Sequence, residues 1–238
     1  MAFAAAVGLI PTMADGVLLD WEGVLADTAD ARRDALLRAL ADEGIDSSRE
    51  SYDERCPGRS VRAAAAAMLG SRASDAALVE IVAVRAERSF AAQLARGFAV
   101  DPGAARFAGL AQLRAPLVIV TAAARAETDV ALRLAGLHDS CAAIVTADDV
   151  IGEAPSRESY ELALARINRR RPVKREQVVV LGDRVPALRA ARSAGLRTLA
   201  VNAPAHVALE ADAAVASLMG LTLDSIDALL DITAERPA

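Results

Sequence analysis

Acidic side chains stand at two places where an apolar run of the chain ends. Residues 17–28 read VLLDWEGVLADT, so Asp20 closes the first run and Glu22 follows two residues later. The run EQVVVLGD at 176–183 also ends in an acid, Asp183. A single acid after a strand is most often a helix cap or a loop residue. Repeated endings of this kind, with a second acid close to the first, indicate a site.

Carboxylates that lie close together repel each other, and each pKa rises unless a cation lies between them. Mg²⁺ is the natural cation, because it binds one or two carboxylates together with water and phosphate oxygens. A carboxylate beside such an ion can attack phosphorus and form an aspartyl-phosphate, and an acid two residues further on can protonate the leaving oxygen. Thr121 ends a third apolar run and could hydrogen-bond the transferring phosphoryl group.

The elements that must position these side chains alternate along the chain. Continuous apolar runs, typical of parallel strands covered on both faces, occur at 16–21, 115–122, 142–149, 176–183 and 196–202. Helical stretches lie between them, among them 125–136, 157–168 and 186–194. This alternation predicts an α/β fold with a doubly wound, Rossmann-like parallel sheet. Ligands of such a sheet bind at the carboxyl ends of its strands, near the switch in strand order.

Residues 29–99 interrupt the alternation. They are rich in Ala and Arg, follow a helical period and contain no convincing strand. The segment VDPGAARFAGLAQL then restarts the alternation, with Pro and Gly at the boundary. We therefore expect an α/β core domain formed by residues 1–28 and 100–238, with an inserted α-helical cap domain at 29–99.

Composition restricts the class of protein. The chain has 238 residues, 54% of them hydrophobic and 25% charged, which is typical of a globular protein. A net charge of −5 gives no reason to expect nucleic acid as a partner. Two cysteines, Cys56 and Cys141, favour a reduced, cytoplasmic setting over a disulfide framework. The apolar start is too short to span a membrane, and translation from Met13 instead of Met1 is an open alternative.

Several segments resemble the motifs of the haloacid dehalogenase superfamily. Its first motif, DxDGxxxD[ST], is similar to DWEGVLADT. The second motif resembles VIVTAAARA, the third IVTADDVIGEAPSRESYELAL, and the fourth VVVLGDRVPALRAARSAGLRTLAV. The segment PGRSVRAA resembles part of the helical cap of the β-phosphoglucomutase and phosphoglycolate phosphatase subgroup. The similarity extends from about residue 15 to residue 230.

The resemblance implies a role for each matching position. Asp20 matches the nucleophile, Glu22 the general acid/base and Thr121 the hydroxyl that binds the phosphoryl group. Mg²⁺ would be held by Asp20, Asp183 and the main-chain carbonyl of Glu22. The positions expected to border or bind the substrate are Gly23, Ala122, Arg59, Arg62 and Arg157.

Three departures from the family pattern matter for activity. The acid/base is normally Asp, so Glu22 is one methylene longer, and a misplacement near 1 Å can cost about a hundredfold in rate. The lysine of the third motif falls on Ala154, or on Glu153 after a shift of one residue. The fourth motif has Gly182 where the subgroup favours Glu.

No other lysine can replace the missing one. The chain's single lysine, Lys174, precedes the strand that leads to Asp183 and so lies at the wrong end of it. The positive charge therefore comes from an arginine or is absent. The candidates are Arg157, Arg125 and Arg184.

Other branches of the superfamily fit less well. Phosphonatases use a cap lysine, which this chain lacks, dehalogenases need no acid at Glu22, and related mutases have a His where Arg32 stands. We expect a Mg²⁺-dependent phosphatase acting on a small phosphorylated metabolite, monomeric or homodimeric, with neither nucleic acid nor membrane as a partner. The alternative is a catalytically impaired protein that keeps the fold to bind a phosphorylated ligand or a protein partner.

Overall fold

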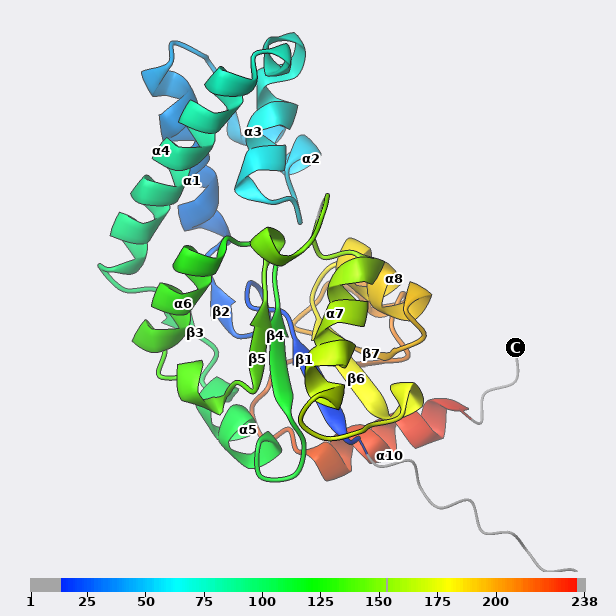
Figure 1. The fold of residues 1–238 in the computed structure, drawn as a ribbon. Coiled ribbons are helices and arrows are strands. Elements are labelled where there is room, and N and C mark those ends of the chain that lie inside the picture. The colour runs from blue at the N-terminus through cyan, green and yellow to red at the C-terminus, as the bar shows by residue number, and fades with distance from the viewer. Residues whose placement is uncertain (1–13, 153, 235–238) are drawn as a thin grey trace, which may run out of the picture.

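The computed structural model describes residues 14–152 and 154–234. Its centre is a six-stranded sheet in the order β5-β4-β1-β6-β7-β8, with every neighbouring pair parallel (Figure 1). The strands are β1 Gly16–Leu19, β4 Leu117–Val120, β5 Ala143–Val145, β6 Val178–Gly182, β7 Arg197–Val201 and β8 Ala213–Val215. The predicted α/β class is confirmed. The prediction missed β8, because this edge strand has three residues, none of them fully buried.

Successive residues of the strands face opposite sides of the sheet, as the two-residue period of a strand requires. Val17 and Leu19 of β1 belong to the core on one face of the sheet, whereas Leu18 belongs to the core on the opposite face. All three side chains are fully buried. Each such burial stabilises the fold by about 1.5–3 kcal/mol before entropy is counted.

Helices cover both faces of the sheet (Figure 1). Those packed against the sheet are α5 Ala104–Ala111, α6 Arg125–Leu134, α7 Arg157–Asn168, α8 Val185–Ser193, α9 Ala205–Ala208 and α10 Leu223–Ala234. The predicted helices at 125–136, 157–168 and 186–194 agree with α6, α7 and α8 to within two residues. Ser156 caps α7 by accepting a hydrogen bond from the Ser159 backbone N–H, which explains why this helix begins where the sequence predicts.

Four helices lie apart from the sheet and form a core of their own (Figure 1). These cap helices are α1 Ala29–Asp42, α2 Arg49–Arg55, α3 Val61–Leu69 and α4 Ala76–Leu94. The chain leaves the sheet through β2 Ala26–Asp27 and returns through β3 Ala99–Val100, and these two strands pair antiparallel. The boundary expected at 28/29 falls just after β2, and the one expected at 99/100 falls within β3.

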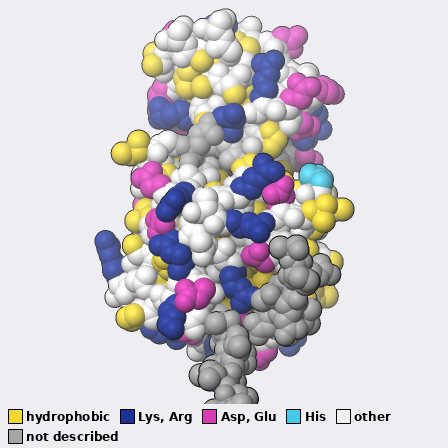
Figure 2. Space-filling view, turned by 90° about the vertical axis from the view of Figure 1, so that its right-hand side faces the viewer, with side chains coloured by type: hydrophobic (Ala, Val, Ile, Leu, Met, Phe, Trp, Pro, Cys, Tyr) yellow, Lys and Arg dark blue, Asp and Glu magenta, His cyan; other side chains and the backbone are white. Residues whose placement is uncertain are grey.

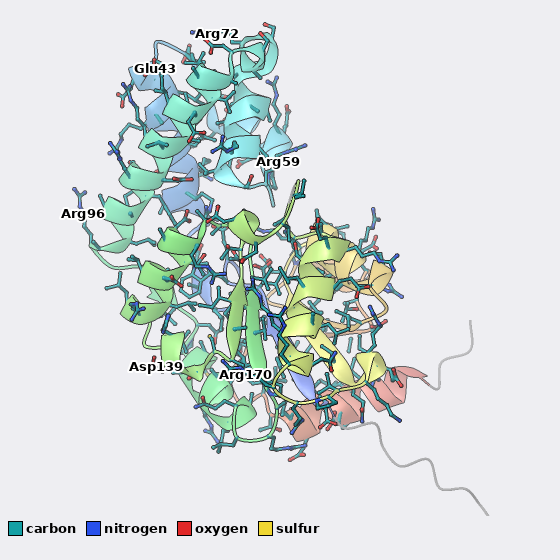
Figure 3. All side chains as sticks on the ribbon, viewed as in Figure 1. Glu43, Arg59, Arg72, Arg96, Asp139 and Arg170 are labelled. Carbon is teal, nitrogen blue, oxygen red and sulfur yellow. The ribbon has the colours of Figure 1, made fainter. Side chains whose placement is uncertain are left out.

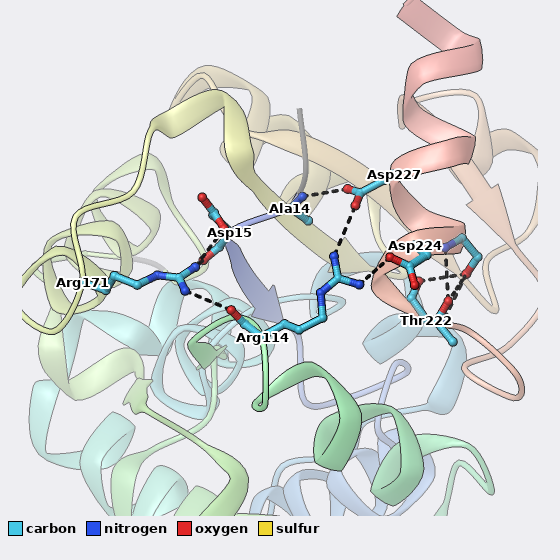
Figure 4. A network of polar contacts seen from close by, with 8 residues as sticks. Ala14, Asp15, Arg114, Arg171, Thr222, Asp224 and Asp227 are labelled. Atoms are coloured by element: carbon cyan, nitrogen blue, oxygen red, sulfur yellow. Dashed lines mark hydrogen bonds and ion pairs between the residues drawn. The ribbon is translucent and has the colours of Figure 1, made fainter. Parts of the chain in front are cut away.

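A polar network joins the start of β1 to the C-terminal helix α10 (Figure 4). It lies at the amino end of β1, whereas Asp20 and Asp183 follow the carboxyl ends of β1 and β6. The Ala14 backbone N–H donates to Asp227 of α10 at 2.7 Å, and Arg114 pairs with Asp224 of the same helix at 2.5 Å. Arg171 donates to the Arg114 carbonyl at 3.0 Å. These contacts fix the amino end of β1, and through it the strand that carries Asp20.

Figure 2 shows basic and acidic side chains distributed over one face of the molecule. Among the described residues, no helix is both long enough and apolar enough to cross a bilayer. Met1 and Met13, the two candidate starts of translation, and Glu153 lie outside the described residues.

Candidate active site

Three of the predicted site residues follow strands that are neighbours in the sheet. β1 lies between β4 and β6, so Asp20, Thr121 and Asp183 leave the carboxyl ends of adjacent parallel strands. The Asp20 backbone N–H donates to the Leu181 carbonyl at 3.0 Å, which extends the pairing of β1 with β6 up to the acid. After the cap helices the chain builds β4 and β5 on one side of β1, then β6, β7 and β8 on the other. The site therefore lies at the switch point of the sheet.

A turn after Asp20 brings the chain back over the strand ends. The Leu25 backbone N–H donates to the Trp21 carbonyl at 3.0 Å, and Gly23 donates to the Ala26 carbonyl at 2.8 Å. Gly23 has a φ of 82°, and a Cβ placed on it would lie 1.8 Å from Asp183 Oδ2. Only glycine fits here, because the turn passes directly against the Asp183 carboxylate.

A cavity opens at this rim, and most of the predicted site residues line it. Its described lining includes Asp20, Glu22, Thr121, Ala122 and Arg59. Arg59 belongs to the loop between α2 and α3, at the end of the cap helices nearest the core, whereas Glu43 and Arg72 lie at the far end (Figure 3). The cap helices therefore contribute a cation to the wall of the cavity.

Three predicted substrate positions are not in this described lining: Gly23, which lies in the turn against Asp183, and two arginines on helix surfaces. Arg62 forms an ion pair with Glu80 and its side chain is 65% exposed. Arg157 lies 3.7 Å from Glu161, one turn along α7, and is 68% exposed. Neither arginine is among the described residues that line the cavity. Both are paired on the surface of their helices, because the outward face of an amphipathic helix carries its charges.

The two carboxylates at the strand ends repel each other. Burial and the nearby Asp183 raise the pKa of Asp20 well above its ordinary value, although Arg184 acts against this shift. Burial likewise raises the pKa of Asp183 to about 6. Asp183 Oδ1 is buried and has no hydrogen-bond partner among the described residues. A cation bound between Asp20 and Asp183 would give the buried Asp183 oxygen a partner and would reduce the repulsion between the two carboxylates.

Glu22 is fixed by ion pairs. Its Oε1 accepts hydrogen bonds from Thr28 Oγ1 at 3.1 Å and Arg32 Nε at 3.0 Å, and its Oε2 accepts one from Arg184 Nη2 at 2.7 Å. Burial would raise the pKa of Glu22, but the two arginines outweigh it and lower the pKa to about 2. In this arrangement Glu22 is an ionised acceptor, and proton donation requires that these contacts loosen.

The sequence did not predict the contacts of Arg32. This residue of α1 pairs with Glu22 and, at 2.5 Å, with Glu127 of α6, and its guanidinium lies 4.5 Å from the centre of the Phe90 ring. The sequence does contain one signal for these contacts. Thr28 and Arg32 are one helical turn apart, so their side chains share a face and can reach the same partner. Arg32 thereby joins two cap helices to the core.

The structure distinguishes the three arginines considered for the missing lysine. Arg125 donates to the Ile144 carbonyl and to Asp149, both at 2.5 Å, and does not line the described cavity wall. Arg184 does line it, between Glu22 at 2.7 Å and Asp183 at 3.5 Å. Of the three arginines, only Arg184 reaches the acids within the described part of the chain.

No group of three or more His, Cys, Asp or Glu side chains among the described residues gathers as a metal site. The set expected from the sequence is of another kind, with two carboxylates and one main-chain carbonyl. The mutual repulsion of Asp20 and Asp183, together with the unpartnered Asp183 Oδ1, fits a divalent ion held by that smaller set.

Known proteins resemble the chain in sequence and in fold. A model of the haloacid dehalogenase-like hydrolases matches residues 14–195. Validoxylamine A 7'-phosphate phosphatase of Streptomyces hygroscopicus subsp. limoneus is 28% identical over 182 residues, which cover 75% of this chain and 81% of that protein. The crystal structure of CbbY from Rhodobacter sphaeroides in complex with phosphate superposes with a TM-score of 0.76 at 25% identity, covering 92% of this chain and 100% of that one. β-Phosphoglucomutase from Clostridium difficile gives a TM-score of 0.81 at 18% identity, covering 94% of this chain and 100% of that one.

Proposed function

Because the chain belongs to the haloacid dehalogenase-like hydrolases, we propose that it is a Mg²⁺-dependent phosphatase that hydrolyses a small phosphorylated metabolite through an aspartyl-phosphate on Asp20. The observation that carries the proposal is the meeting of Asp20 and Asp183 at adjacent strand ends, with one Asp183 oxygen buried and unpartnered. Two similar proteins support the substrate class by their names, one a validoxylamine A 7'-phosphate phosphatase and the other crystallised in complex with phosphate.

The proposed reaction has two displacements at phosphorus. A carboxylate oxygen of Asp20 attacks the phosphorus of a phosphate monoester, and the bond from phosphorus to the alcohol oxygen breaks as the new one forms. The alcohol leaves with a proton. Water then attacks the phosphorus of the aspartyl-phosphate, which releases inorganic phosphate and restores the Asp20 carboxylate.

Thr121 is suited to hold the phosphoryl group. Its side chain is buried beside the cavity, and its Oγ1 accepts a hydrogen bond from the Ala123 backbone N–H at 3.2 Å. Because that contact uses a lone pair, the hydroxyl proton stays available for a phosphoryl oxygen. Thr121 thus orients the group and stabilises charge that develops on its oxygens.

Asp20, Asp183 and the main-chain carbonyl of Glu22 would hold Mg²⁺. When bound, the ion would neutralise the carboxylates and the phosphoryl oxygens. Glu22 is expected to exchange protons with the alcohol and the attacking water. Its three hydrogen bonds make that exchange dependent on Arg32 and Arg184, since an ionised Glu22 with a low pKa is a poor donor.

The proposal is tested by phosphate release from p-nitrophenyl phosphate and a panel of sugar and polyol phosphates, with Mg²⁺ and with EDTA. We expect turnover with Mg²⁺, and a loss of at least about 10³-fold in Asp20→Asn because the amide cannot act as the nucleophile. Asp139→Asn is the matched control, since that carboxylate is fully exposed and lies outside the cavity. Turnover that survives in Asp20→Asn would refute the proposal. The absence of turnover with every substrate of the panel would refute it as well.

The second candidate function is binding without turnover. It is favoured by one observation, the ion pairs that keep Glu22 ionised and engaged. Retained binding of phosphate esters together with no turnover on the whole panel is the result this alternative requires.

A further inference from the structure

Arg184 reaches from the end of β6 into the group of acids at the rim of the sheet. Its Nη2 donates to Glu22 Oε2 at 2.7 Å, and its Nε lies 3.5 Å from Asp183 Oδ2. It lines the same cavity as Asp20 and Thr121, and 25% of its side chain is exposed. We propose that Arg184 is a built-in cation of the site, which binds the phosphoryl group directly and lets the site take up phosphate without a divalent metal ion. This inference rests on the proposed function, because it concerns the same cavity.

The charges around the cavity make such a cation necessary. Asp20 and Glu22 line the cavity, Asp183 lies against Arg184 of the same lining, and a phosphate entering there brings more negative charge. An anion is repelled from such a group unless positive charge lies within a few ångströms. Arg184 contacts two of the acids, and its charge also favours the ionised form of Asp20.

Arg32 of the cap helix α1 also lines the cavity, but its guanidinium is held by other groups of the protein. Arg32 contacts Glu22 at 3.0 Å and Glu127 at 2.5 Å, so one guanidinium is shared by two carboxylates. Its guanidinium carbon lies over the Phe90 ring, 4.5 Å from the ring centre. Only 11% of the Arg32 side chain is exposed, against 25% for Arg184, so Arg184 is the more accessible of the two guanidinium groups to a ligand in the cavity.

The donor geometry of Arg184 supports this assignment. A guanidinium carries five N–H donors in one plane, and the contacts of Arg184 use Nη2 and Nε. Within the described residues, Nη1 has no hydrogen-bond partner. Arginine binds phosphate oxygens through paired donors of this kind, and Glu22 holds the group in place before the ligand arrives.

The same position predicts an effect on metal affinity. The Arg184 guanidinium lies beside Asp183, whose other oxygen is the buried, unpartnered Oδ1. A positive charge at this distance repels a divalent ion and lowers the negative charge that attracts it. Removing the guanidinium should therefore weaken phosphate binding and strengthen metal binding, two effects of opposite sign from one substitution.

Isothermal titration of inorganic phosphate into the full chain in EDTA tests the inference. We expect measurable binding by the wild type, a Kd raised at least about tenfold in Arg184→Gln, and an intermediate Kd in Arg184→Lys, which keeps the charge but loses the planar donors. Arg189→Gln should bind as the wild type does. This matched control lies on the same helix, α8, is 66% exposed and pairs with Glu210.

Mn²⁺ binding followed by electron paramagnetic resonance supplies the second measurement. The affinity for Mn²⁺ should rise several-fold in Arg184→Gln and stay unchanged in Arg189→Gln. Circular dichroism establishes whether each variant is folded. If Arg184→Gln is not folded, the phosphate Kd of Arg184→Lys decides the question. An unchanged phosphate Kd in Arg184→Gln, or no phosphate binding by the wild type in EDTA, would overturn the inference. Turnover of phosphate esters with Mg²⁺ is measured separately, so the proposed phosphatase activity can stand when this inference fails.

Discussion

At the end of β1 the chain turns through Gly23, whose φ of 82° lies in the left-handed region. Left-handed backbone is strained for any residue with a Cβ. The position carries a second restriction, because a Cβ would meet Asp183 Oδ2 at 1.8 Å. Gly44 separates the two effects, since it has a φ of 68° and nothing within 4 Å of its would-be Cβ.

We predict that Gly44→Ala lowers the free energy of unfolding by about 1–2 kcal/mol and leaves turnover unchanged. Gly23→Ala should lower the free energy of unfolding further. It should also reduce turnover and Mn²⁺ affinity, because the added methyl group must displace the Asp183 carboxylate. Urea denaturation and metal titration of the two variants provide the comparison. Equal metal affinity in both would show that Gly23 serves the turn alone.

Single residues show where sequence reasoning ends. Asp20, Thr121 and Asp183 could be grouped from sequence, because the carboxyl ends of neighbouring parallel strands meet. Arginines could not be assigned in this way. A long side chain can reach several partners: Arg62 pairs with Glu80 of the neighbouring helix α4, and Arg157 pairs with Glu161 of its own helix.

Among the elements, the segment after β5 has a fixed conformation that depends on Asp149. This carboxylate accepts a hydrogen bond from the Thr146 backbone N–H at 2.8 Å, and it pairs with Arg125 of α6 and Arg166 of α7. Burial acts to raise the pKa of Asp149, but Arg166, Thr146 and Arg125 together lower it to about 2. One side chain thus joins the end of a strand to the helices on either face of the sheet.

Asp149→Asn is predicted to cost about 2 kcal/mol of stability at neutral pH, because two arginines lose a charged acceptor. The pKa of Asp149 is lowered on folding, so its contribution is fully present above the ordinary value of 3.8 and is lost as the pH falls toward 2. The difference between wild type and variant should therefore shrink in acid. Denaturant midpoints across that range measure it, with Asp139→Asn as the exposed control. A difference that does not change with pH would mean that the Asp149 charge contributes nothing.

Elements were easier to predict than contacts. The helices α6, α7 and α8 and five strands follow from continuous apolar runs and helical periods. The short strands β2, β3 and β8 were not predicted, because two or three residues carry no period and their burial is incomplete. They pair only because the longer elements bring them together.

For the whole molecule, the cap helices and the sheet share one cavity. The cap contributes Gly58 and Arg59 to its wall, while Arg32 pairs with Glu22 and Glu127 of the core. Composition and the alternation of strands and helices predicted an α/β core and a group of cap helices. The ion pairs between core and cap depend on the angle at which the two meet. Sequence does not supply that angle. The contacts at the junction of cap and core are therefore the ones that the sequence predicts least well.

Reductive trapping tests the central claim, that Asp20 carries the phosphoryl group. Borohydride added during turnover converts an acyl phosphate to an alcohol, so an aspartyl-phosphate becomes homoserine, which peptide mass spectrometry locates. We predict homoserine at position 20 in the wild type, only when a phosphate ester and Mg²⁺ are both present, and none in Asp20→Asn. Sustained turnover with an unmodified Asp20, or trapping at another residue, would contradict the account.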